Sequence, residues 1–256
     1  MRKREKFLVS SFVLSFALLG TQYVPLDFRL LGTALLFFVT YAMSAWALFD
    51  DLGGIEWFMV VPFPCLYAIS VSLFYFLLPE NILSKIAVLA LFGVGMYAIY
   101  LTCNIFSVAK FRTIQLLRAA HAVSFLFTTL LIEFFFANTI FSLHLPFWAN
   151  GLAISLATFP LVLISLWSIE LKQKLDISLL HQAITVAVLM GELAIGISFL
   201  PTTLWAASLC IVGSMYAVLG VLVTKLSGRL FQNTVWEYVG VWIVMLLAFF
   251  AMVQWK

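Results

Sequence analysis

Charged residues are scarce in this chain. Only 10% of its 256 residues are charged, whereas 64% are hydrophobic. Soluble domains carry roughly 25% charged residues, so this chain has too few to cover a water-facing surface, and lipid is the expected solvent for most of it. The net charge of +3 is small, and the basic residues form no patch of the kind that binds nucleic acid.

Patterns that bind metals or build catalytic centres are also missing. The three cysteines, Cys65, Cys103 and Cys210, fall inside apolar runs, and an odd number of buried thiols argues against a disulfide framework. The three histidines show no HxxxH or HExxH spacing. Phosphate-binding glycine motifs, the GxSxG motif and a plausible triad are absent. We therefore expect no metal and no cofactor, and no residue is predicted to be catalytic.

Long apolar runs dominate what is present. A membrane-spanning helix needs about 20 mostly apolar residues, and nine such runs can be drawn, at 7–24, 30–49, 57–78, 86–108, 119–140, 147–169, 179–199, 203–224 and 238–255. They lack the two-residue alternation of barrel strands. The predicted fold is an all-α, polytopic transmembrane helix bundle with nine spans. The connections are short, so residues 1–256 are predicted to form a single integral membrane domain.

The basic residues indicate the orientation of these spans. With a cytoplasmic N-terminus, eleven of the fourteen basic residues fall on the inner side, as the positive-inside rule requires: Arg2, Lys3, Arg4, Lys6, Lys110, Arg112, Arg118, Lys172, Lys174, Lys225 and Arg229. The basic start is similar to a signal peptide, but its apolar run continues to Val24 without a cleavage motif, so we predict an uncleaved first span. The expected location is a bacterial-type plasma membrane.

Two acids, Glu133 and Glu192, lie well inside predicted spans. Both sit about 5 Å to the outer side of their span midpoints, and no Lys or Arg lies inside any span. An ionisable group at this depth is costly and indicates a functional site. We expect both carboxyls to be protonated unless water reaches them, and such groups can relay protons. The alternative is that each glutamate is a neutral hydrogen-bonding group between helices.

The seventh span carries a polar stripe. His181, Thr185 and Glu192 fall within about 40° of one another around a helix. Beside them runs a row of small residues, Ala183, Ala187 and Gly191, which favours close helix packing. We therefore predict that this face points to the bundle interior.

Small and polar residues in two further spans extend this prediction. In the fifth span, Thr129 lies one turn before Glu133, within bonding reach. The eighth span has its own small row, Gly213, Ala217 and Gly220. Spans five, seven and eight are predicted at the bundle centre. The candidate pathway comprises Glu133, Glu192, Thr185, His181 and Thr129.

Three prolines are predicted to distort spans. Pro62 and Pro64 lie in the third span and Pro160 lies midway along the sixth. Each removes a backbone N–H, which kinks or opens a helix. Such breaks serve either packing or a solute site.

Two predicted inner loops are acidic. Asp50, Asp51 and Glu56 follow the second span, and Glu170 and Asp176 follow the sixth. In a nine-span protein with a cytoplasmic N-terminus, this layout resembles that of UbiA-type prenyltransferases. The resemblance implies magnesium diphosphate held between the loops and prenyl transfer to a lipid acceptor. Neither loop matches the aspartate motifs of that family, and solvated turn residues are the alternative.

Three functions follow as hypotheses. The first is a small-solute or proton-coupled permease that uses the glutamates. The second is an intramembrane, prenyltransferase-like enzyme that modifies lipids. The third is a non-catalytic membrane subunit or scaffold whose small-residue faces bind partner helices. The lipid bilayer is the expected environment in all three.

Overall fold

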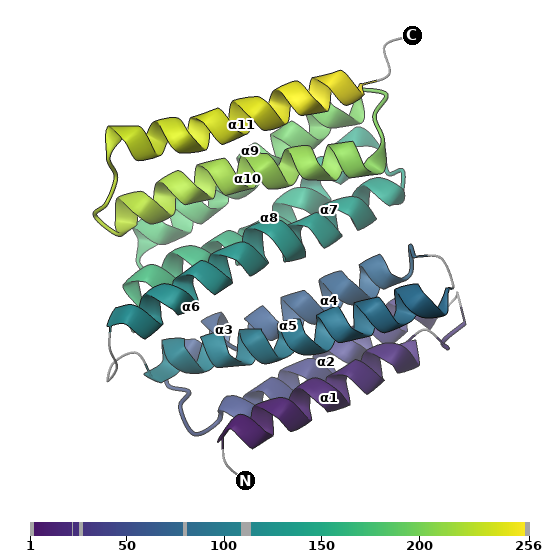
Figure 1. Ribbon diagram of the computed structural model, residues 1–256, viewed down its shortest axis with the longest axis vertical. Helices are drawn as coiled ribbons and strands as arrows, with labels where there is room; N and C mark the ends of the chain where they lie inside the picture. The colour runs from purple at the N-terminus through teal and green to yellow at the C-terminus, as the bar shows by residue number, and fades with distance from the viewer. Residues whose placement is uncertain (1–2, 22, 26–27, 79–80, 109–113, 254–256) are drawn as a thin grey trace. The chain divides into compact units, whose positions relative to one another are not determined.

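The computed structural model describes residues 3–21, 23–25, 28–78, 81–108 and 114–253. Within these residues the secondary structure consists of helices and turns, without strands. The chain forms two compact units, Met1–Ser124 and Phe125–Lys256. Figure 1 locates the helices of each unit.

The first unit contains α1 (Lys3–Thr21), α2 (Arg29–Leu48), α3 (Glu56–Met59), α4 (Pro62–Tyr75), α5 (Ile82–Val108) and the start of α6 (Ile114–Leu126). The third predicted span is divided between α3 and α4, and α4 begins at Pro62. Proline suits the first position of a helix because that position needs no backbone N–H donor. The predicted distortion at this proline is therefore confirmed.

Four helical segments make the core of this unit. α1 packs on α2 and α5, and α4 packs on the same two helices (Figure 1). At their centre the Tyr100 ring is fully buried and stacks on Phe7, with ring centroids 5.9 Å apart. Its hydroxyl lies 3.0 Å from the Ser44 hydroxyl. This pair of hydroxyls joins α2 and α5 across the core, a common kind of contact between membrane helices.

The second unit continues α6 into a π-helical segment, η3 (Phe127–Ile132), and then α7 (Glu133–Ser142). It also contains α8 (Phe147–Glu170), α9 (Ile177–Ser198), α10 (Leu204–Leu226) and α11 (Gln232–Met252). α10 contacts α7, α8, α9 and α11. The prediction that the eighth span is central is confirmed within this unit.

Glycines set the closest helix contacts of the second unit. A Cβ atom on Gly191 of α9 would lie 2.7 Å from the Gly151 carbonyl oxygen of α8, so the two backbones nearly touch. On α10, a Cβ at Gly220 would meet the ring of Tyr238 on α11. Both small-residue rows predicted from the sequence therefore bring helices together.

Eight helical segments of the described chain are long and apolar enough to cross a membrane. They agree with the last eight predicted spans, although α11 begins at Gln232, earlier than expected. α1 is outside this set, and its first four residues are all charged. The all-α bundle is confirmed, and the chain is a multi-pass membrane protein. A ninth span, a single domain across 1–256 and a bacterial membrane stay predictions.

Candidate functional site

The Glu133 carboxyl is the most enclosed acidic group among the candidate residues. It opens α7 and is 0% exposed. The Thr158 hydroxyl of α8 donates a hydrogen bond of 2.8 Å to Glu133 Oε1. Glu133 Oε2 is buried and has no hydrogen-bond partner among the described residues. One carboxyl oxygen thus accepts a hydrogen bond and the other has no partner among the described residues. Solvent reaches neither oxygen in the described structure.

The helix that holds Glu133 departs from regular α-helix nearby, whereas α8 stays α-helical through Pro160 and lacks only the backbone donor of that residue. The π-helical η3 ends immediately before Glu133, whose N–H donates to the Thr128 carbonyl five residues back. On the facing helix, Pro160 lies two residues after Thr158 and supplies no backbone donor. Single π-helical turns are found frequently at functional sites. The pair therefore joins two segments with weakened helical bonding.

Thr129 lies beside Glu133 in sequence but does not serve it as a donor. Its buried hydroxyl donates to the Phe125 carbonyl at 2.6 Å. The expected bond between Thr129 and Glu133 is therefore replaced by the bond from Thr158. The extra residue of the π-helical turn changes the helix phase on which the expectation relied.

The polar stripe of α9 faces outward. His181, Thr185 and Glu192 are all exposed, while Ala183 and Gly191 are buried. The prediction of an interior-facing polar stripe is wrong, because the small residues form the packed face against α8 and the polar residues lie on the opposite side. The Thr185 hydroxyl bonds back to the His181 carbonyl at 2.8 Å, which satisfies it within its own helix.

Part of this stripe borders a recess between α9 and α10. The recess has a volume of about 590 Å³ and is lined by His181, Thr185, Gln182 and Leu222, among others. Glu192 is not among its lining residues. The structure thus brings His181 and Thr185 together and gives no contact between Glu133 and Glu192 in the described chain. The role of all five candidate residues in a pathway stays a prediction.

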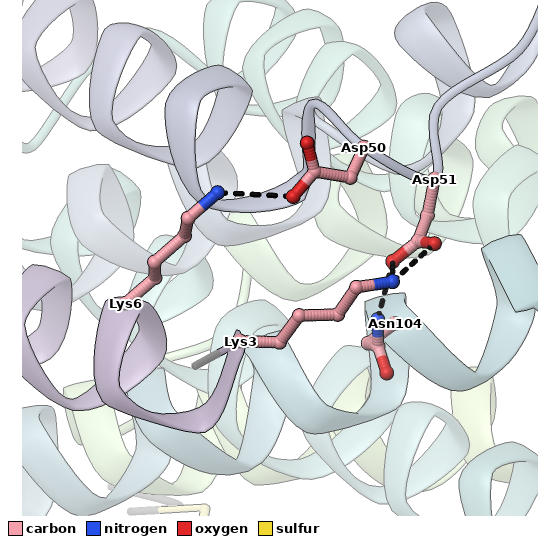
Figure 2. A network of polar contacts seen from close by, with 5 residues as sticks. All are labelled: Lys3, Lys6, Asp50, Asp51 and Asn104. Carbon is pink, nitrogen blue, oxygen red and sulfur yellow. Dashed lines mark hydrogen bonds and ion pairs between the residues drawn. The ribbon is translucent and has the colours of Figure 1, made fainter. Parts of the chain in front are cut away.

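The acidic turn after α2 is bonded to the N-terminal lysines, as Figure 2 shows. Lys3 Nζ lies 2.6 and 2.8 Å from the two oxygens of Asp51, and Lys6 Nζ lies 3.0 Å from Asp50 Oδ2. Asn104 of α5 donates to Asp51 Oδ2 at 2.8 Å. The contacts place the start of α1, the end of α2 and the last turns of α5 at one end of the first unit.

These contacts change the electrostatics of the turn. The hydrogen bond and the charge of Lys6 hold the pKa of Asp50 below its ordinary value of 3.8. The stabilisation from this pair is therefore complete above pH 3.8 and is lost as the pH falls through the lowered pKa. The Asp50 side chain is 51% exposed and that of Lys6 is 19% exposed, and the solvated carboxylate makes the pair a modest tether.

The second acidic loop has a similar arrangement. Lys172 Nζ lies 2.9 Å from Glu170 and 3.5 Å from Asp176. The hydrogen bond that Lys172 donates to Glu170, together with the charge of that carboxylate, raises the pKa of Lys172. No group of three His, Cys, Asp or Glu side chains with metal-binding geometry occurs in the described residues. Four of the five loop acids are thus paired with lysines, and Glu56 accepts a hydrogen bond from the Gly53 N–H at 3.0 Å. The magnesium diphosphate role that the resemblance implied stays a prediction.

Thr158 and Asn104 are residues that sequence reasoning did not connect to their partners. Thr158 lies 25 positions from Glu133 along the chain, and threonines are frequent in membrane helices. One signal was available, since Thr158 and Pro160 lie midway along the predicted neighbouring span. Comparison with known proteins adds nothing to this picture: no family model, no curated protein and no solved structure matches the chain.

Proposed function

We propose that the protein is a small-solute permease whose transport cycle is coupled to protonation of Glu133. The observation that carries this proposal is the fully buried carboxyl, bonded through Oε1 to Thr158 and open at Oε2. Ionisable groups inside membrane bundles commonly mark ion pathways and proton relays. Glu133 has the burial and the incomplete bonding that such a group needs.

Because Glu133 Oε2 has no hydrogen-bond partner among the described residues, we expect ionisation of this carboxyl to depend on a change in the structure around it. An uncompensated buried charge costs several kcal/mol. Release of the Glu133 proton therefore requires water, a cation or a solute group to reach Oε2. In the described structure the side chain is 0% exposed and lines none of the three recesses of about 560, 590 and 360 Å³. Proton release is thus tied to an opening between α7 and α8.

The two helices are suited to such an opening. η3 adjoins Glu133 on one side, and Pro160 adjoins Thr158 on the other. Bends in helices concentrate at prolines and at π-helical turns. A change in either segment would move the Thr158 hydroxyl relative to the carboxyl. The irregular segments are the elements that we expect to differ between the closed and open states.

Transport in proteoliposomes tests the proposal. The protein is reconstituted under an inside-alkaline pH gradient and offered labelled amino acids, sugars, nucleosides and organic acids. We expect one class to accumulate, and we expect Glu133→Gln to abolish accumulation while exchange of the solute continues, because exchange needs no net proton release. Accumulation by Glu133→Gln at the wild-type level would refute proton coupling at this site.

Glu192→Gln is the matched variant in the same assay. Glu192 is exposed on α9, whereas Glu133 is enclosed. A loss of accumulation in both variants would support the prediction that the two glutamates share one pathway. Normal transport by Glu192→Gln would restrict the proton site to Glu133.

A second candidate function is that of a partner-binding membrane subunit. It is favoured by the exposed Glu192, which lies about 9 Å from the end of a spanning helix. A polar face in contact with lipid is costly, and a partner helix would cover it. If this face binds protein, Glu192→Leu will disrupt an assembly seen by light scattering in native-lipid particles. If it faces lipid, the same change will leave the mass unchanged and raise the melting temperature.

A further inference from the structure

An apolar groove runs along the first unit between α1 and α5. It has a volume of about 560 Å³, and its lining includes Leu8, Phe12 and Phe16 of α1 and Ala90, Val94 and Tyr97 of α5. Several of these side chains are strongly exposed, among them Phe16 at 70% and Val94 at 72%. The two helices approach closely at the floor, where a Cβ on Gly93 would lie 3.0 Å from Ser15 Oγ.

The length of the groove matches one leaflet of a bilayer. Along α1 it extends from Leu8 to Leu19, which is about 17 Å of helix. Half of a hydrocarbon core is about 15 Å. A single acyl chain of a lipid therefore fits along the groove, whereas a spanning helix of a partner would extend about twice as far.

The charged turn at the start of α1 indicates which lipid fits. Lys3 and Lys6 are occupied by Asp51 and Asp50. Arg4 is exposed and has no ion pair or hydrogen bond within the part of the chain that the structure describes. Around the helix it lies within about 40° of the groove residues Leu8 and Ser15. Arg4 thus lies at the end of the groove, one helical turn from Leu8.

A second polar group lies on the other wall. Tyr97 lines the groove on α5, about 10 Å along the helix from Asn104, which is bonded to the same acidic turn as Lys3. The Tyr97 hydroxyl has no hydrogen-bond partner among the described residues. A donor at this depth suits the ester region of a lipid whose phosphate lies near Arg4.

We propose that the groove between α1 and α5 binds an anionic phospholipid of the cytoplasmic leaflet, with its phosphate at Arg4 and an acyl chain between the two helices. The proposal is independent of proton coupling at Glu133. It rests on the apolar lining, the length of one leaflet and the charge complementarity at one end.

Native mass spectrometry of the detergent-solubilised full chain tests this site. The protein is titrated with dioleoyl phosphatidylglycerol and, separately, with dioleoyl phosphatidylcholine. We expect one molecule of the anionic lipid to bind more tightly than its zwitterionic counterpart. Arg4→Gln should weaken phosphatidylglycerol binding about fivefold, which corresponds to ~1 kcal/mol for one basic residue at a membrane surface. Lys174→Gln removes an exposed charge outside the groove and should leave binding unchanged.

A second pair of variants tests the acyl chain. Ala90→Phe fills the groove from an exposed position, and Ala87→Phe adds the same bulk on the same helix outside the groove. We expect only Ala90→Phe to reduce binding of both lipids, with both variants melting near the wild-type temperature. Equal binding by the two phenylalanine variants, or by Arg4→Gln and Lys174→Gln, would overturn the proposal. A dimer that Ala90→Phe abolishes, without lipid binding, would assign the groove to a second copy and would overturn it too.

Discussion

The Glu133 carboxyl meets a different environment at each of its two oxygens. Oε1 accepts the Thr158 hydroxyl, and Oε2 has no partner in the described chain. Hydrogen bonds between membrane helices contribute about 0.6 kcal/mol on average and at most about 1.7. A buried polar group that loses its partner costs about 1–3 kcal/mol. The single bond from Thr158 is therefore the main local restraint on this carboxyl.

Removal of that bond should destabilise the second unit. Thr158→Val keeps the shape of the side chain but removes the donor, and we expect a loss of about 1–2 kcal/mol in the free energy of unfolding. Thr158→Ser keeps the hydroxyl and should lose less. Thermal unfolding in detergent, followed by tryptophan fluorescence, measures both. Equal melting temperatures for the valine variant and the wild type would show that the bond contributes nothing to stability.

Single residues were the hardest level to predict. The position of Glu133 inside a predicted span and the absence of basic residues from the spans could be read from the sequence, because charges are rare in lipid-embedded segments. The hydrogen bond from Thr158 to Glu133 could not be predicted, because the sequence does not show which of its many threonines faces the carboxyl. The link between Lys3 and Asp51 had a clue: an acidic turn without basic residues and a basic N-terminus were predicted on the same side of the membrane.

At the level of helices, small residues mark the packed faces more reliably than polar ones. The row containing Gly191 packs on α8, while His181 and Glu192 of the same helix are exposed. In water, polar residues mark the exposed face of a helix. In lipid the packed and the exposed faces are both apolar, and helices pack where small residues let their backbones approach closely. The approximate positions of the last eight spans were predictable from continuous apolar sequence, whereas the direction of the polar face of α9 was not.

Gly191 should therefore resist even a small substitution. In Gly191→Ala the added methyl would overlap Ser155 Oγ and would lie 2.7 Å from the Gly151 carbonyl oxygen. Because one of these atoms is backbone, α8 and α9 must separate, and we expect a loss of about 1–3 kcal/mol in stability. Gly196→Ala on the same helix meets open space and should be neutral or stabilising. Comparable melting temperatures for the two variants would contradict this account of the helix contact.

Across the whole molecule, two of the loops predicted on the cytoplasmic side have acids that are paired with nearby lysines. The turn after α2 is bonded to Lys3 and Lys6, and the loop after α8 is bonded through Lys172. These pairs lie at the ends of helices, where the bilayer meets water. The assignment of these loops to the cytoplasmic side stays a prediction.

Cysteine labelling tests the orientation. The three native cysteines are buried and should react little. Lys174→Cys and Pro201→Cys place thiols at exposed positions on opposite ends of α9. We expect a membrane-impermeant maleimide to label position 174 only in inside-out vesicles and position 201 only in right-side-out vesicles. Labelling of both from one side would show that α9 does not span, and the reverse pattern would show that the orientation is inverted.

The bonds between the N-terminal lysines and the turn after α2 also have a consequence during synthesis. Lys3 and Asp51 are 48 positions apart, and Lys6 and Asp50 are 44 apart. At about 5–20 residues per second, the ribosome makes the lysines several seconds before their partners. Throughout that interval the lysine charges are unneutralised and are available to orient the first helix. In the folded protein Asp51 and Asp50 neutralise these charges. The lysines that orient the nascent chain therefore become structural tethers in the folded protein.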